Sequence, residues 1–248
     1  MKNTAFITGA TSGFGEAIAR RLNKEGYKII ALGRRKERLE KLASELNNVH
    51  IVPCDIRDKD SVFDAIKNLP DEFKDIEILV NNAGLALGQE AVIDASIDDF
   101  EVMIDTNIKG LIYVTKAVLP IMKNRKSGYI FNIGSVAGAW PYAGGNVYGA
   151  TKSFVKQFSF NLRNDLKGLN IRVTEIAPGL CKTEFSEVRF RGDKAKSDAV
   201  YENTKFITAD DISLIVSNCI NMPASVNINT LEVMATTQTW AGFYFERD

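Results

Sequence analysis

Tyr148 and Lys152 stand four residues apart in this chain of 248 residues, and Ser135 precedes Tyr148 by 13 positions. On a helix, this spacing places two side chains on one face, so the lysine ammonium can lie close to the tyrosine phenol. A free tyrosine has a pKa of about 10, and a neighbouring cation lowers that pKa by favouring the phenolate. The pair could therefore exchange a proton with an alcohol or a carbonyl near neutral pH. Taken alone, the same spacing also fits an exposed helix start.

A glycine-rich turn near the N-terminus indicates a nucleotide partner for this pair. Gly9, Gly13 and Gly15 follow an apolar segment directly and open an amphipathic one. Glycine permits a tight turn and a close backbone approach, and a helix N-terminus offers free N–H groups to a phosphate. The spacing differs from the G-x-G-x-x-G fingerprint, but the position after a first strand is the same. We therefore predict a nucleotide site formed by Gly9, Ala10, Thr11, Ser12, Gly13, Phe14 and Gly15.

Two arginines, Arg34 and Arg35, follow the second apolar segment. An NAD-specific protein usually carries an acidic residue at this place, where it binds the ribose 2′-hydroxyl. Guanidinium groups match the geometry of a phosphate and pair with it strongly, so the arginines favour the 2′-phosphate of NADP. Alternatively, one of the two belongs to the solvated first turn of the next helix.

The order of apolar and amphipathic segments predicts the fold. Short runs rich in Val, Ile and Phe alternate with longer amphipathic stretches, a pattern typical of a parallel sheet covered by helices on both faces. We predict strands at residues 4–8, 28–32, 49–52, 76–81, 128–133, 171–176 and 228–233. The main helices are predicted at residues 13–24, 36–46, 98–124 and 148–166. With seven strands and no linker, residues 1–248 are expected to form one Rossmann-like, doubly wound α/β domain.

The segment 178–208 is the least regular part of the chain. It carries many charges and Gly192, and it shows little hydrophobic periodicity. Loops after the strand C-termini build the active site in folds of this class, so an irregular segment here is a candidate substrate lid. A plain flexible connection fits the pattern equally well.

Composition argues against several kinds of partner. The 31 basic and 31 acidic side chains give a formal net charge of zero, so neither nucleic acid nor a membrane surface is indicated. No apolar run approaches the roughly 18 residues that span a bilayer, and the glycine turn begins too early for a signal peptide. We expect a cytoplasmic protein.

The cysteines and the single histidine narrow the chemistry further. Cys54, Cys181 and Cys219 are odd in number and widely spaced, so we expect reduced, buried thiols and neither a disulfide framework nor a metal site. His50 lies in an apolar run that is typical of a strand. The segment 134–138 around the serine lacks the G-x-S-x-G spacing of a nucleophile elbow. A Ser-His-Asp hydrolase is therefore not expected.

Taken together, the motifs resemble the short-chain dehydrogenase/reductase family over essentially the whole chain. They are Thr8-Gly9-x-x-x-Gly13-x-Gly15, Asn81-Asn82-Ala83-Gly84, Asn107, Ser135, Tyr148-x-x-x-Lys152 and Pro178-Gly179. The resemblance implies hydride transfer to or from a nicotinamide. Tyr148 is implied as acid and base, and Lys152 would lower its pKa and hold the nicotinamide ribose. Ser135 would form a hydrogen bond with the substrate oxygen, and Asn107 would complete a proton relay through water.

The same resemblance implies further cofactor contacts. The adenine would meet Asp55 and Ile56, the cleft would be lined by Asn82, Ala83 and Gly84, and the nicotinamide would lie near Pro178, Gly179, Leu180 and Thr183. Each residue alone has a structural alternative. Asn81 and Asn82 could end a strand, Asn107 could be a satisfied polar residue in a helix, and Asp55 could cap a turn. Their joint occurrence favours the cofactor site.

Three segments, 139–146, 187–193 and 227–232, are similar to the bacterial NADP-dependent 3-hydroxy acid dehydrogenases within that family. This closer resemblance implies a homotetramer that oxidises L-serine, L-allo-threonine or 3-hydroxypropionate, or reduces malonic semialdehyde. The chain is one residue shorter just after Leu180. Two alternatives stay open: an NADPH-dependent reductase of a 3-oxoacyl thioester or general ketone, and a non-catalytic NADP-sensing protein. The intact Tyr148 and Lys152 argue against the second.

A 3-hydroxy acid carries a carboxylate, which is costly to bury without a cation. Arg189 and Arg191 alternate with apolar residues and would share one side of an extended segment in the lid. Together with Arg247 near the C-terminus, they are the candidate partners of the substrate carboxylate. Aromatic residues in the tail 240–245 are expected to pack on the pocket or on a neighbouring subunit.

Overall fold

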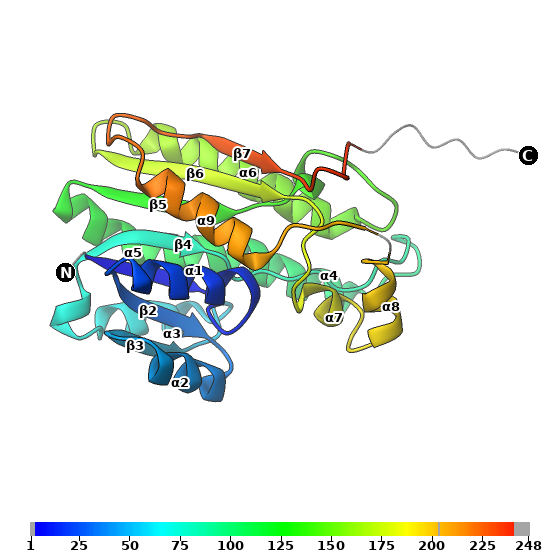
Figure 1. Ribbon diagram of the computed structural model, residues 1–248, viewed down its shortest axis with the longest axis horizontal. Helices are drawn as coiled ribbons and strands as arrows, with labels where there is room; N and C mark the ends of the chain where they lie inside the picture. The colour runs from blue at the N-terminus through cyan, green and yellow to red at the C-terminus, as the bar shows by residue number, and fades with distance from the viewer. Residues whose placement is uncertain (1–2, 203, 241–248) are drawn as a thin grey trace, which may run out of the picture.

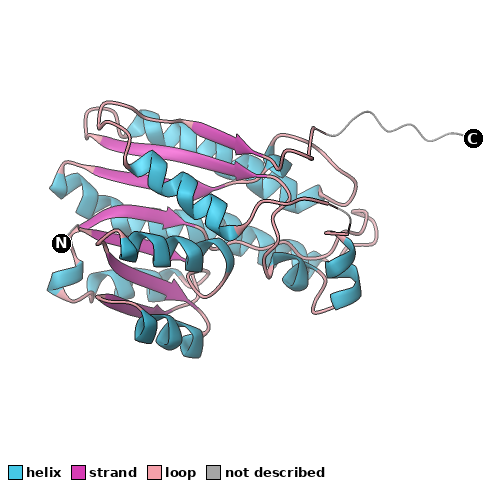
Figure 2. Ribbon diagram, viewed as in Figure 1, coloured by secondary structure: helices cyan, strands magenta, loops and turns pink. Residues whose placement is uncertain are grey.

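The computed structural model describes residues 3–202 and 204–240. Arg247 and residues 241–245 of the aromatic tail lie outside the described residues. Within the described ranges, no helix is both long and apolar enough to cross a bilayer. Figures 1 and 2 show a twisted sheet with helices on both faces and a cluster of short helices beyond one end of the strands.

In the described part of the chain, seven parallel strands form one sheet in the order β3-β2-β1-β4-β5-β6-β7 (Figure 1). The strands are β1 (Thr4–Thr8), β2 (Lys28–Gly33), β3 (Val49–Pro53), β4 (Ile76–Asn81), β5 (Gly128–Ile133), β6 (Ile171–Pro178) and β7 (Thr230–Val233). This confirms the predicted doubly wound arrangement. Every strand lies within two residues of its predicted bounds, because buried parallel strands appear in a sequence as short apolar runs.

Helices cover both faces of this sheet, and the alternation along each strand decides which of them its side chains meet. In β1, Ala5 and Ile7 pack on one face, whereas Phe6 packs on the other. The first face is covered by α1 (Gly13–Lys24), α2 (Lys36–Glu45) and α9 (Ala209–Ile220). The second is covered by α3 (Lys59–Lys67), α5 (Leu111–Arg125) and α6 (Asn146–Asp165). Two single 3₁₀ turns complete the layers, η1 (Asp71–Phe73) and η3 (Val136–Gly138).

The prediction of one continuous helix over residues 98–124 was wrong in its middle. Helix α4 (Ile97–Ile104) runs into a π-helical segment, η2 (Asp105–Gly110), before α5 begins at Leu111. A π turn keeps the direction of the chain, so the apolar pattern in the sequence continues through it. Such turns are rare and are found often at functional sites. In this chain the π-helical segment carries Asn107.

The predicted lid, residues 178–208, is more regular than its sequence indicates. Short helices α7 (Phe185–Arg189) and α8 (Lys194–Ala199) lie beyond the C-terminal ends of the strands (Figure 1). Arg189 ends α7, and Arg191 follows with a left-handed φ of 53°. The expected extended segment is therefore absent, and the two arginines do not share one side of a strand.

Candidate active site

A cavity of about 620 Å³ opens at the C-terminal ends of the strands, between the glycine turn, α6 and the lid. Most residues predicted from the sequence line it: Gly9, Thr11, Ser12, Gly13, Phe14, Arg34, Arg35, Asp55, Ile56, Asn82, Ala83, Gly84, Ser135, Tyr148, Lys152, Pro178, Gly179, Leu180, Thr183 and Arg189. The predicted residues Ala10, Gly15, Asn107 and Arg191 do not line it. Ala10 and Asn107 are buried behind the lining, and Gly15 packs beneath the glycine turn.

The glycine turn needs its glycines for conformation and for space. Gly9 and Gly13 have φ of 67° and 55°, which L side chains rarely adopt. A Cβ at Gly15 would lie 2.3 Å from the carbonyl oxygen of Gly9. The amide of Asn82 donates to the carbonyl oxygens of Thr8 and Gly9 at 2.9 and 3.2 Å, so the loop after β4 braces the turn. Asn82 therefore does more than end a strand.

The start of α1 fits an anion such as the pyrophosphate of a dinucleotide. Ser12 is the N-cap residue of α1, and its side chain makes no capping hydrogen bond to the helix backbone. The first N–H groups of a helix have no partner within it, and the helix dipole adds partial positive charge there. Gly13 leaves room at this place, because a Cβ there would come within 3.3 Å of the Thr183 side chain. The N-terminal end of α1 and the glycine turn can therefore receive phosphate oxygens.

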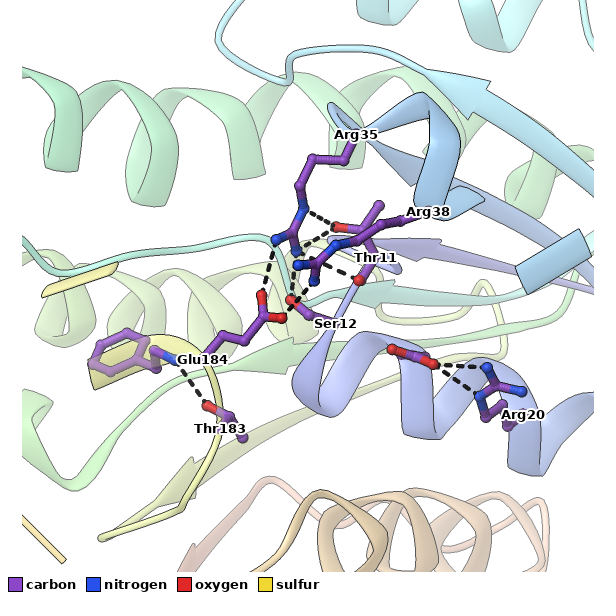
Figure 3. Close-up of polar contacts among 9 residues, drawn as sticks. Thr11, Ser12, Arg20, Arg35, Arg38, Thr183 and Glu184 are labelled. Atoms are coloured by element: carbon purple, nitrogen blue, oxygen red, sulfur yellow. Dashed lines mark hydrogen bonds and ion pairs between the residues drawn. The ribbon is translucent and has the colours of Figure 1, made fainter. Parts of the chain in front are cut away.

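Two guanidinium groups stand beside this turn. Arg34 is exposed at the mouth of the cavity. Arg35 is the N-cap residue of α2, and its guanidinium donates to Thr11 Oγ1 at 3.0 Å and to Ser12 Oγ at 2.8 Å. Figure 3 shows Arg35 reaching across to these residues and to Glu184 of the lid. Both arginines therefore lie where a phosphate next to the adenosine ribose would need them.

Asp55 is held on the cavity wall by Arg57. The Arg57 guanidinium donates to Oδ2 of Asp55 through Nη2 at 2.6 Å and through Nε at 3.0 Å. Burial works against the charged carboxylate, but the hydrogen bonds from Arg57 outweigh it and lower the pKa of Asp55. The cap of α3 is Asp58, which accepts from the N–H of Ser61 at 3.1 Å. Asp55 Oδ1 also accepts from the backbone N–H of Arg57 at 3.0 Å, so Asp55 caps the turn before α3, as the structural alternative predicts, and lines the cavity as well.

Helix α6 brings Tyr148 and Lys152 to the floor of the cavity. Both are nearly buried, at 8 % and 6 % exposure. Nζ of Lys152 lies 5.9 Å from the centre of the Tyr148 ring and donates to the carbonyl oxygen of Ile133 at 2.8 Å. Phe185 of the lid packs against the phenol, with ring centres 5.6 Å apart. The predicted common face is formed, but the hydrogen bond of the ammonium goes to strand β5.

The pKa values of the pair differ from the expectation of a tyrosine lowered by lysine. Burial raises the pKa of Tyr148 to about 12, against the hydrogen bond with Ser135 and the charge of Arg189. Burial also lowers the pKa of Lys152 to about 8, against the attraction of Glu175. Desolvation penalises both charged forms, and the ammonium is bonded to a backbone carbonyl. With these residues alone, Tyr148 is a protonated phenol at neutral pH.

Ser135 and Asn107 are held in place by hydrogen bonds beside this pair. Ser135 follows β5, and its Oγ accepts from the N–H of Ala137 at 3.1 Å. The Asn107 amide donates to the carbonyl of Leu85 at 2.8 Å and to Thr151 Oγ1 at 3.0 Å, and its oxygen accepts from the N–H of Leu85 at 2.9 Å. The side chain of Asn107 is thus occupied in holding the wall of the cavity.

Arg189 enters the cavity from the end of α7. Its guanidinium donates to the hydroxyl of Tyr142 at 2.5 Å and lies 5.2 Å from the ring centre of Tyr148. Nε of Arg189 is buried and has no hydrogen-bond partner. Within the described ranges, no carboxylate forms an ion pair with it. A cation with a free donor therefore lies beside the candidate acid.

Arg191, which was predicted to bind substrate, is directed away from the cavity in this arrangement of the lid. Its Nη2 donates to both carboxylate oxygens of Asp99, at 2.7 and 2.6 Å. Its side chain is 67 % exposed and lies outside the cavity lining. The physical reason is the left-handed turn after α7, which an alternating sequence pattern does not reveal.

Sequence reasoning missed Glu184, Arg38 and Gln238. Glu184 forms ion pairs with both Arg35 and Arg38. Gln238 Oε1 accepts from the N–H of Leu180 at 2.7 Å and supports the segment after β6. Glu184 directly follows a predicted cofactor residue, and Arg38 lies one helical turn after Arg35, so proximity in sequence was a usable signal. Gln238 offered no such signal, because its partner is 58 residues away.

The sheet order, the glycine turn and the buried Tyr148–Lys152 pair define a nucleotide-dependent α/β oxidoreductase. Residues 3–194 match the family model described as short chain dehydrogenase. The chain belongs to the short chain dehydrogenase family.

Relatives within the family match this chain over nearly its full length. It is 56 % identical to NADP-dependent 3-hydroxy acid dehydrogenase YdfG of Escherichia coli strain K12, over 97 % of this chain and 98 % of the relative. It is 50 % identical to sulfoacetaldehyde reductase 2 of Chromohalobacter salexigens, over 100 % of both. Among solved structures, the closed form of serine dehydrogenase complexed with NADP+ matches with a TM-score of 0.97 and 55 % identity, over 99 % of this chain and 100 % of the other.

Proposed function

We propose that this chain transfers a hydride between NADP(H) and the 3-carbon of a small 3-hydroxy acid. One observation carries this proposal. The buried pair Tyr148 and Lys152 faces the same cavity as the glycine turn, and the partly unpartnered guanidinium of Arg189 lies beside the phenol. Full-length relatives named for NADP and for 3-hydroxy acid or serine dehydrogenation support the cofactor and the substrate class.

The residues around the glycine turn fit NADP, which supplies the hydride acceptor or donor when it is bound. The start of α1 and Gly9 would hold the pyrophosphate, because they offer N–H groups and no Cβ. Arg34 and Arg35 would hold the 2′-phosphate, and Asp55 would accept from the adenine. The nicotinamide end would be framed by Asn82, Ala83, Gly84, Pro178, Gly179, Leu180 and Thr183.

Tyr148 would move the proton. In the reductive direction, its protonated phenol would donate to the oxygen of the carbonyl that accepts the hydride. In the oxidative direction, the phenol must first lose its own proton and then accept that of the substrate hydroxyl. Ser135, which bonds Tyr148, would orient the substrate oxygen, and Lys152 would add positive charge at the ribose. Asn107 would act by positioning the wall of the cavity through its hydrogen bonds to Leu85 and Thr151.

Arg189 would bind the carboxylate of the substrate. Tyr142 uses one of its five N–H donors, and the buried Nε stays free. A carboxylate that accepts from this guanidinium would satisfy the buried donor and would place an acid group at a fixed distance from the phenol. The relative named sulfoacetaldehyde reductase acts on a sulfonate, which is another anion that a guanidinium can bind.

The test follows NADPH absorbance with the purified protein. The panel contains L-serine, L-allo-threonine, 3-hydroxypropionate, 3-hydroxyisobutyrate and, for reduction, malonic semialdehyde and sulfoacetaldehyde, with NAD as the control cofactor. We expect turnover of at least one small acid, with NADP strongly preferred. Turnover of a 3-oxoacyl thioester or a neutral ketone alone would overturn the assignment of the substrate class.

We also propose that the chain forms a homotetramer in the cytoplasm. Large apolar side chains lie exposed before and at the start of α4, with Ile93 and Ile97 at 90 % and 65 % exposure, and such patches often form subunit contacts. Light scattering during size-exclusion chromatography should give four chains per particle, and a monomer would contradict this part of the proposal.

A further inference from the structure

Glu184 links the lid to the far end of the cofactor cavity. It stands directly before α7, and its Oε2 and Oε1 accept from Arg35 at 2.9 Å and from Arg38 at 2.5 Å (Figure 3). These two arginines lie 149 and 146 residues away along the chain. A single carboxylate thus joins the segment between β2 and α2 to the segment that covers the substrate.

The position of this carboxylate coincides with the proposed phosphate site. Arg35 also donates to Thr11 and Ser12 of the glycine turn, and Glu184 itself lines the cavity. Burial opposes the charged form of Glu184, but the hydrogen bonds from Arg38 and Arg35 outweigh it and lower the pKa of the carboxyl group. At neutral pH, the arginines at this end of the cavity are therefore partly neutralised by an anion of the protein itself.

The ion pairs of Glu184 with Arg35 and Arg38 are weak enough for another anion to replace the carboxylate. The three side chains are 36 % to 46 % exposed, and exposed pairs of this kind contribute only about 0–1 kcal/mol each. A phosphate with up to two negative charges binds such guanidiniums more strongly than one carboxylate does.

We infer that Glu184 is an exchangeable internal anion that sets the affinity for the 2′-phosphate and tethers the lid to the cofactor site. Its carboxylate would compete with the 2′-phosphate for Arg35 and would keep its ion pair with Arg38 when the phosphate binds. The inference rests on the proposed placement of the 2′-phosphate at Arg34 and Arg35. Glu184 is therefore expected to weaken binding of NADPH relative to NADH and to steady the lid in the free protein.

Equilibrium binding tests this role without catalysis. Dissociation constants are measured by fluorescence or calorimetry for NADPH, NADH and the fragments 2′,5′-ADP and 5′-ADP. We expect Glu184→Gln to tighten the binding of NADPH and 2′,5′-ADP about 3- to 10-fold and to change the binding of NADH and 5′-ADP by less than about twofold. Most of the gain in affinity should be lost in high salt. Glu187→Gln is the matched control, because it removes the same charge from an exposed position on α7, and it should change nothing.

Hydrogen exchange of the lid provides the second readout. Backbone amides of α7 should exchange faster in free Glu184→Gln than in the free wild-type protein, and Glu184→Asp should restore part of the protection. Equal NADPH affinity and equal lid exchange in Glu184→Gln and Glu187→Gln would overturn the inference.

Arg35→Ala separates the two proposals. If it leaves the ratio of NADPH to NADH affinity unchanged, the proposed phosphate site is itself wrong. If it lowers that ratio while Glu184→Gln behaves like its control, only the role of Glu184 is lost.

Discussion

The floor and the rim of the cavity are held by different forces. The floor is formed by Tyr148 and Lys152, with Asn107 packed behind them. These residues are 8 %, 6 % and 2 % exposed, and their hydrogen bonds run to backbone groups and neutral side chains. The rim, formed by Arg35, Arg38 and Glu184, is 36 % to 46 % exposed and is joined by ion pairs. Buried hydrogen bonds cannot be exchanged for water at low cost, whereas exposed ion pairs can.

This difference matches the roles that we propose, proton transfer at the floor and recognition of anions at the rim. The proton donor and its neighbours need one fixed geometry, because displacement of a reacting group slows the reaction steeply. Under the proposed function, the arginines that would recognise anions must release one partner and accept another when a ligand binds. Arg189 combines the two conditions, since its Nε is buried with the floor while its backbone ends α7 of the lid.

The largest expected effect comes from removing the acid at the floor. Tyr148→Phe should lower kcat about 10³-fold, because the proton transfer of a general acid contributes 10² to 10⁴ in rate. NADPH affinity should stay within about twofold, measured by fluorescence titration. Tyr142→Phe removes a hydroxyl in the same cavity and is the control, with a loss below about tenfold. A similar loss in both variants would mean that Tyr148 is not the proton donor.

The pH dependence of the reaction tests whether the pKa of Tyr148 is lowered by Lys152, as the sequence predicts, or raised by burial, as the structure indicates. Burial raises the pKa of Tyr148 to about 12, so the phenolate fraction, and with it kcat/KM for oxidation, should rise about tenfold per unit from pH 7 towards pH 8 and level off above it, where Lys152 loses its charge. Reduction needs the protonated phenol, which persists over this range. The rate of reduction should fall above pH 8, because Lys152, with a pKa of about 8, loses its charge there. A flat oxidation profile from pH 7 to pH 9 would show that the pKa lies below 7 in the working complex.

A smaller effect is expected at the boundary between floor and rim. Arg189→Ala should raise KM for a small hydroxy acid about 30-fold, since losing one partner of a buried charge pair costs about 2 kcal/mol or more. The KM for a neutral alcohol of the same length should change little. Steady-state kinetics on the two substrates checks this, and an equal rise for both would point to a disturbed lid instead of a lost carboxylate partner.

The smallest effect is expected for the exposed arginine of the lid. Arg191→Ala should change KM less than twofold and the free energy of unfolding by less than about 1 kcal/mol, because the Arg191 side chain in its pair with Asp99 is 67 % exposed. Denaturant melts and the same kinetic assay measure both. A large rise in KM in this variant alone would place Arg191, and not Arg189, at the substrate in the working enzyme.

Most of the sheet and the glycine turn were predictable, because each depends on patterns within a few residues. Buried parallel strands appear as apolar runs, and the turn at Gly9 to Gly15 requires glycine whatever surrounds it. The π-helical segment at Asn107 and the short helices of the lid were not predictable. A π turn barely alters the apolar period, and α7 and α8 have only five and six residues, too few to show an amphipathic pattern.

The sequence by itself determined that Tyr148 and Lys152 share one face of a helix, that a glycine turn follows the first strand and opens α1, and that arginines follow β2. Only the tertiary structure decided the state of these groups. It buried the pair so that desolvation raises the pKa of the phenol, bonded the ammonium to Ile133, and sent Arg189 inward while Arg191 turned to Asp99. The reason is that spacing along the chain determines neighbours within a turn, whereas burial and partners 19 to 92 residues away depend on packing.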